Sequence, residues 1–111
     1  MYKTKIRKAR LEKFNEIGAV NVKIRTLIGG EDGALASTLH EIIVGTRGST
    51  AMHRHDWEHH LVVETGRGYL QMVEEKVALT PGDAVLVGAG EDHRFVQTGK
   101  VPLKFLVVTP L

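Results

Sequence analysis

Alternation of hydrophobic and polar residues, the pattern of a strand with one buried face, recurs along most of this chain. The clearest run covers residues 20–28, where β-branched apolar residues alternate with polar ones. Seven further runs are bounded by segments rich in glycine, proline or aspartate, at 34–44, 59–64, 69–73, 77–79, 84–87, 93–97 and 103–109. Short strands with turn signals about every 8 to 12 residues and almost no helix predict an all-β sandwich or barrel.

The segment before residue 20 supports two interpretations. Ile6, Ala9, Phe14 and Ile17 fit one face of a helix that ends at the next residue, a glycine. Residues 4–7 also alternate as a strand does. The pattern does not decide between a helix and a strand here.

The run at 34–44 places His40 on one face of its strand and Glu41 on the other. We expect the face with Glu41 to be exposed, and His40 to point inward. His40 then either lines a pocket or is a histidine at the edge of the core with its own hydrogen bond. The glycine-containing segment 45–49 predicts the turn that ends this strand.

A length of 111 residues predicts a single domain, 1–111, with an N-terminal arm at 1–19 and the barrel at 20–111. No apolar run approaches the roughly 18 residues of a membrane span, and the N-terminus lacks the apolar core of a signal peptide. We therefore expect a cytoplasmic protein without membrane contact. Because the chain has no cysteine, any metal ligands must be nitrogen or oxygen atoms.

Positive charge is concentrated in the first 25 residues, which hold eight Lys and Arg against two Glu. The remainder is acidic, and the arm has few aromatic residues to stack on bases. We therefore do not expect nucleic-acid binding. The arm is predicted to be solvated or to cross to a second subunit.

Four of the six histidines fall within residues 53–60. In an extended segment His53 and His55 point to the same side, and a strand entered at His59 places that side chain on the same face as the apolar Leu61 and Val63. Convergent imidazoles are ligands for divalent transition metals. Histidine-rich tracts also occur on plain surfaces, but this one leads directly into a strand.

Two motifs in the chain resemble the paired motifs of the cupin superfamily. They are Gly48-x4-His53-x-His55-x3-His59-x6-Gly66 and Pro81-Gly82-x5-Gly88-x-Gly90-x2-His93-x3-Gln97. The resemblance covers residues from about 40 to 108. It implies a double-stranded β-helix, a jelly-roll-like barrel with a divalent metal near its mouth.

The resemblance implies four metal ligands, His53, His55, His59 and His93, as in small four-histidine cupins of bacteria and archaea. His59 stands where the family usually has glutamate. Glu58 or His60 stays open as the alternative to His59. Either alternative requires the strand to shift by one residue. This shift would exchange the two faces of the strand and bury Glu64 in place of Val63, which favours His59.

A site of neutral imidazoles leaves the metal its full charge, and octahedral geometry leaves two adjacent positions for a substrate or dioxygen. We expect Mn or Fe, with Zn, Cu or Ni possible, in a pocket lined by His40, Phe95 and Phe105, with His40 as the candidate catalytic residue. The leading interpretation is a dioxygenase-like enzyme for a small organic substrate, because no strong catalytic base is evident. The alternatives are a non-catalytic module that binds a small metabolite and a metal-dependent isomerase or lyase.

We also expect a homodimer. The strand at 20–28 follows the basic arm and offers an edge that can pair across subunits.

Overall fold

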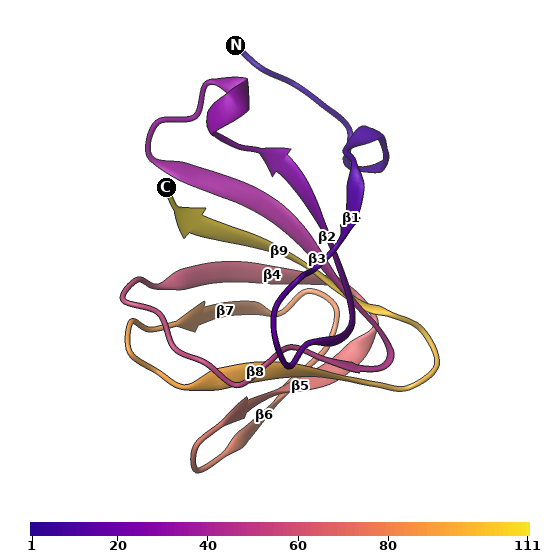
Figure 1. Ribbon diagram of the computed structural model, residues 1–111. Coiled ribbons are helices and arrows are strands. Elements are labelled where there is room, and N and C mark those ends of the chain that lie inside the picture. The colour runs from indigo at the N-terminus through magenta and orange to yellow at the C-terminus, as the bar shows by residue number, and fades with distance from the viewer.

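The computed structural model describes residues 1–111 and is built almost entirely of strands (Figure 1). In chain order the elements are η1 (Ile6–Lys8), β1 (Leu11–Lys13), β2 (Val20–Ile28), η2 (Gly30–Asp32), β3 (Ser37–Ser49), β4 (His59–Thr65), β5 (Arg67–Met72), β6 (Lys76–Leu79), β7 (Ala84–Val87), β8 (His93–Thr98) and β9 (Leu103–Pro110). All eight strands predicted from the hydrophobic pattern are present. No helix is long and apolar enough to cross a membrane.

The strands form one antiparallel sheet that curls on itself, in the order β6-β5-β8-β3-β9-β4-β7, with β2 and then β1 added beside β3. The 13-residue β3 connects the two layers, because it pairs with β2 and β9 along its length and with β8 through its last residue. In Figure 1 the layer with β9, β4 and β7 lies above the layer with β8, β5 and β6. This architecture confirms the predicted all-β barrel.

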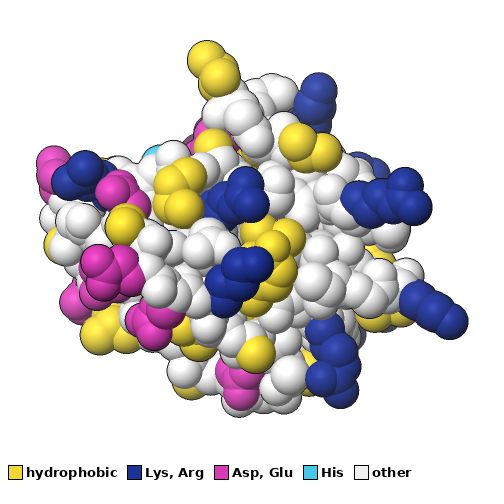
Figure 2. Space-filling view, turned by 90° about the horizontal axis from the view of Figure 1, so that it is seen from below, with side chains coloured by type: hydrophobic (Ala, Val, Ile, Leu, Met, Phe, Trp, Pro, Cys, Tyr) yellow, Lys and Arg dark blue, Asp and Glu magenta, His cyan; other side chains and the backbone are white.

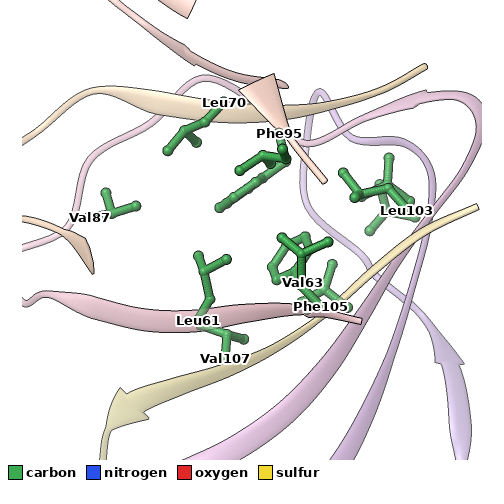
Figure 3. Close-up of a cluster of buried hydrophobic side chains, with 12 residues drawn as sticks. Leu61, Val63, Leu70, Val87, Phe95, Leu103, Phe105 and Val107 are labelled. Carbon is green, nitrogen blue, oxygen red and sulfur yellow. The ribbon is translucent and has the colours of Figure 1, made fainter. Parts of the chain in front are cut away.

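Side chains from both layers meet in a core of twelve buried hydrophobic residues (Figure 3). Along β9 the residues Leu103, Phe105 and Val107 are buried, and the residues between them are not. Phe105 contacts Phe95 of the opposite layer, with ring centroids 4.4 Å apart. The predicted alternation therefore identifies the strand faces that close the barrel.

The turn predicted at 45–49 is wrong, because these residues are the last part of β3. The two glycines in this segment permit close packing: a Cβ at Gly45 would lie 2.4 Å from the Asn21 side chain, and one at Gly48 would lie 2.7 Å from the Gly45 carbonyl oxygen. The register of β2 against β3 shifts here, and Asn21 and Arg47 both have positive φ. The glycines thus mark a bulge.

The N-terminal segment forms neither a long helix nor a strand at 4–7. Its strand β1 pairs with Lys23–Arg25 of β2, so the middle of the edge that we expected to pair across subunits is covered within the chain. The guanidinium of Arg25 holds this segment by donating to the carbonyl oxygens of Ile6, Arg7 and Ala9, at 3.4, 3.3 and 3.0 Å. The homodimer and the boundary after residue 19 both stay predictions.

Charge is also unevenly spread over the surface. On the face in Figure 2, Asp and Glu side chains gather toward one side, and Lys and Arg side chains toward the other, with small hydrophobic groups between them.

The predicted exposure of Glu41 is wrong, since its side chain is buried with a relative exposure of 4%. It faces away from the core but lies 3.3 Å from Arg25 Nε, across the pairing of β2 with β3. Burial, followed by hydrogen bonding and negative charge from Glu41, raises the pKa of the neighbouring Glu64 from 4.5 to about 7, against the opposing charge of Lys104. Glu64 Oε1 is buried without a hydrogen-bond partner, and a proton on Glu64 would remove the repulsion between the two carboxylates.

This carboxyl pair predicts a specific pH dependence of stability. Because the pKa of Glu64 is higher in the folded chain than in the unfolded one, the contribution of Glu64 to the free energy of unfolding is lost as the pH rises from about 5 to 8. Glu64→Gln mimics the protonated acid, so the variant should gain about 1–3 kcal/mol over the parent at pH 8 and little at pH 5. Urea unfolding at both pH values measures the difference.

Glu74→Gln, in the exposed tip between β5 and β6, is the control, and no pH-dependent gain is expected from it. An equal gain from Glu64→Gln at both pH values would contradict the raised pKa of Glu64.

Candidate metal centre

A pocket of about 210 Å³ opens at one end of the barrel, and aromatic and aliphatic side chains make up much of its wall. The apolar part of the lining comes from Phe14, Ile24, Ile42, Trp57, Phe95, Phe105 and Val107. The histidines predicted as ligands, His53, His55, His59 and His93, all line the same pocket. The structure thus brings the two sequence motifs to one place.

His53 and His93 are held side by side by their backbones. Each donates its N–H to the carbonyl oxygen of the other, at 3.1 and 2.9 Å, in an isolated bridge beside β8. Their Nδ1 atoms lie 2.7 Å from the Ala51 carbonyl and 2.8 Å from the Glu91 carbonyl. A carbonyl only accepts, so the proton lies on Nδ1 in each neutral ring, and Nε2 is free to bind a metal.

His53, His55 and His93 form the core of the candidate centre. One ligand nitrogen from each lies within 4.8 Å of the other two. The ring of His55 is 4.4 Å from that of His53 and 5.6 Å from that of His93, between centroids. This spacing fits three imidazoles that converge on a single ion.

His59, the first residue of β4, stands next to this group but outside it. Its ring centroid is 4.7 Å from that of His55 and 5.7 Å from that of His93, and its Nδ1 is buried without a hydrogen-bond partner. Leu61 and Val63 on the same face are buried, as the predicted register requires. His59 as the fourth ligand stays a prediction, and its orphaned nitrogen fits that role.

The surroundings of His55, His59 and His93 lower the pKa of each ring and favour its neutral form. Burial, followed by the charges of His55, His93 and His53, lowers the pKa of His59 to about 4. Burial is also the largest cause that lowers the pKa of His55 and that of His93. Neutral imidazoles keep the lone pairs that a metal needs, so the donor set fits a divalent transition metal.

The two alternatives for the fourth ligand lie elsewhere. Glu58 Oε1 is 3.0 Å from His60 Nε2, and both side chains are exposed. His60 belongs to an apolar groove on the outer face of the sheet, beside Val62 and Leu86, and neither Glu58 nor His60 lines the metal pocket. This placement favours His59 over both.

His40, Phe95 and Phe105 line the same pocket as the histidine cluster, and their role in binding a substrate stays a prediction. His40 points inward from β3, on the same face as the buried Ile42 and Val44. Burial lowers the pKa of His40, so its ring is neutral near pH 7 and can accept a proton. Its catalytic role stays a prediction.

Several residues of the pocket were not predicted from the sequence, and Phe14, Glu16 and Trp57 are the most informative of them. Phe14 and Glu16 come from the N-terminal segment, and Glu16 Oε1 lies 3.7 Å from His53 Nδ1. Trp57 stacks on His55 with ring centroids 4.6 Å apart and 10° between the planes. The ambiguous pattern of residues 1–20 gave no signal that this segment reaches the pocket.

Comparison with known proteins agrees with this geometry. The family described as Cupin domain matches residues 39–109. The polyketide cyclase RemF from Streptomyces resistomycificus is 34% identical, over 99% of this chain and 79% of that one, with a TM-score of 0.94. A search of curated proteins finds no match.

Two further solved structures share the fold. A predicted oxalate decarboxylase from Thermotoga maritima is 23% identical, over 99% of both chains, with a TM-score of 0.86. A cupin 2 conserved barrel domain protein from Rhodopseudomonas palustris is 20% identical, over 99% of this chain and 83% of that one, with a TM-score of 0.80. With its curled β-barrel, its paired motifs and a family match over most of its length, this chain belongs to the cupin family.

Proposed function

We propose that this cupin is a metal-dependent enzyme that converts a small organic compound with a carbonyl or enol group. The observation that carries the proposal is the convergence of His53, His55 and His93, with His59 beside them, on one end of an apolar pocket. A bound divalent metal, with Mn or Fe expected first, would polarise an oxygen of the substrate as a Lewis acid.

The chain's own side chains supply binding and orientation. Phe95 and Phe105 present adjacent rings to the pocket and suit the flat apolar body of a conjugated or aromatic compound. The pocket volume of about 210 Å³ limits the size of the substrate, or allows only part of a larger substrate to enter. A neutral His40 can accept a proton at a ring nitrogen from a carbon next to a substrate carbonyl.

Two reaction classes fit such a site. A non-oxidative reaction of the isomerase, lyase or cyclase type is favoured by His40 in the pocket and by the similarity to a polyketide cyclase. A dioxygenase-like oxidation is the second candidate, supported by a ligand set of imidazoles that leaves positions for both substrate and dioxygen. The sequence favoured oxidation because no strong catalytic base was evident. That argument loses force because His40 lines the pocket.

The test uses metal-loaded protein and a panel of β-dicarbonyl and phenolic compounds, with and without oxygen. Substrate loss that is equal in anaerobic buffer supports the non-oxidative class, and loss with matching oxygen uptake supports the dioxygenase. His40→Gln should keep the metal but lower kcat about 100-fold or more in the non-oxidative case, where a positioned base contributes most. Stabilisation by compounds of the panel without turnover of any of them would indicate a binding module and contradict the proposal.

A further inference from the structure

We propose that Glu16 is a positioning residue of the metal centre, which fixes the backbone of Ala51 and through it the ring of His53. The inference rests on the proposed metal site and extends it to the N-terminal segment. Glu16 is the only carboxylate residue that lines the pocket. It lies 37 residues before His53 in the sequence, so only the fold brings the two together.

Three short contacts connect the carboxylate to the ring. Glu16 Oε1 accepts a hydrogen bond from the Ala51 N–H at 3.2 Å. The Ala51 carbonyl accepts one from His53 Nδ1 at 2.7 Å. The same Glu16 oxygen lies 3.7 Å from that Nδ1. The backbone of Ala51 is therefore held by Glu16 through its N–H, and its carbonyl, in the following peptide group, holds His53.

This chain of contacts decides which nitrogen His53 offers to a metal. With the proton held on Nδ1 by a carbonyl, Nε2 keeps its lone pair and its direction. His93 is oriented in a similar way by the Glu91 carbonyl, but no carboxylate is hydrogen-bonded to the Glu91 peptide. A negative group near the proton-bearing nitrogen also makes the imidazole a stronger ligand.

The fold holds Glu16 in this position. On one side of it, Phe14 donates its N–H to the Val22 carbonyl at 3.0 Å and packs against the core. On the other side, Ala19 donates to the Glu16 carbonyl at 3.0 Å, and Gly18 has a φ of +94°. A Cβ on Gly18 would lie 3.1 Å from the Ala51 Cβ, so the segment packs directly on Ala51, the residue whose N–H Glu16 binds. The Glu16 side chain is 26% exposed.

The experiment compares Glu16→Ala and Glu16→Gln with Glu12→Ala in the full chain. Glu12 lies on the same segment but is 59% exposed and makes only a 4.0 Å contact with Arg10, so it is the matched control. Two readouts are used: the affinity for Co²⁺ in competition with a chelator, and the ¹⁵N NMR signals of the His53 ring in metal-free protein. Circular dichroism checks that each variant is folded.

We expect Glu16→Ala to weaken Co²⁺ binding about 10- to 100-fold and to leave His53 as a mixture of tautomers. Glu16→Gln keeps an acceptor for the Ala51 N–H and should recover part of the affinity and the single tautomer. Glu12→Ala should match the parent in both readouts.

The two readouts separate this inference from the proposed function. If the parent protein binds Co²⁺ and Glu16→Ala has the same affinity and the same His53 tautomer, the role of Glu16 is overturned and the metal site stands. Parent protein that binds no Co²⁺ would overturn the metal site, and with it the role of Glu16 as a positioning residue for a metal ligand. A loss that is equal in the Glu12 variant would also overturn the inference, since it would show a general effect of the segment.

Discussion

His55→Ala is expected to weaken metal binding by more than about 100-fold, beyond the effect of losing a residue that only orients a ligand. His55 belongs to the group of three whose ligand atoms converge, and it has a ring contact with each of the other three candidate ligands. It is also only half-buried, so its removal should leave the barrel folded. Titration of metal-free protein with Co²⁺ or Zn²⁺ against a chelator gives the affinity.

His60→Ala is the control for this experiment. His60 comes from the same histidine-rich stretch, but it is exposed and faces the outside of the sheet. Its variant should bind metal as the parent does. If His60→Ala lost metal and His55→Ala did not, the centre would have to be built on the other face of β4.

Gly66→Ala is expected to destabilise the fold by about 3–6 kcal/mol, a large part of the stability of an ordinary domain. Gly66 joins β4 to β5 with a φ of +82°, and a Cβ there would lie 2.1 Å from the Pro102 carbonyl oxygen and 2.8 Å from the Leu103 Cα. These neighbours are backbone atoms and cannot move aside as a flexible side chain does. Urea unfolding of both proteins measures the loss.

Gly99→Ala separates the close contact from the backbone strain. Gly99 has a φ of +81°, nearly that of Gly66, but an added Cβ would meet nothing within 4 Å. We therefore expect only the cost of the left-handed conformation, about 1–2 kcal/mol. Equal losses in the two variants would show that the approach of Pro102 is not what requires glycine at position 66.

Strand positions were the most predictable part of this protein. The run at 20–28 coincides with β2, because period-two alternation reports directly which side chains face the core, and the uninterrupted apolar run at 84–87 coincides with β7. Segment 45–49 was predicted wrongly, because glycine occurs both in turns and where two strands approach closely, and the sequence does not distinguish the two. Glu41 was predicted wrongly because its burial depends on Arg25 and Glu64, which lie on other strands.

The candidate site was predictable only where its residues are close in sequence or carry a family motif. His53 and His55 are two residues apart on an extended segment, and His93 was found through the second motif. Glu16 and Phe14 carry no local signal, because they reach the pocket through the pairing of β1 with β2 and the turn that follows. The separation of His59 from the group of three is a matter of distances between ligand atoms, which spacing in a sequence does not specify.

The central claim is that this cupin holds one divalent transition metal through its histidine cluster. The most direct test is elemental analysis of the protein purified without an affinity tag and without added metal. We predict about one metal ion per chain, with Mn or Fe expected first. Protein that carries no metal, and takes up none when Mn²⁺, Fe²⁺ or Zn²⁺ is supplied, would contradict the account.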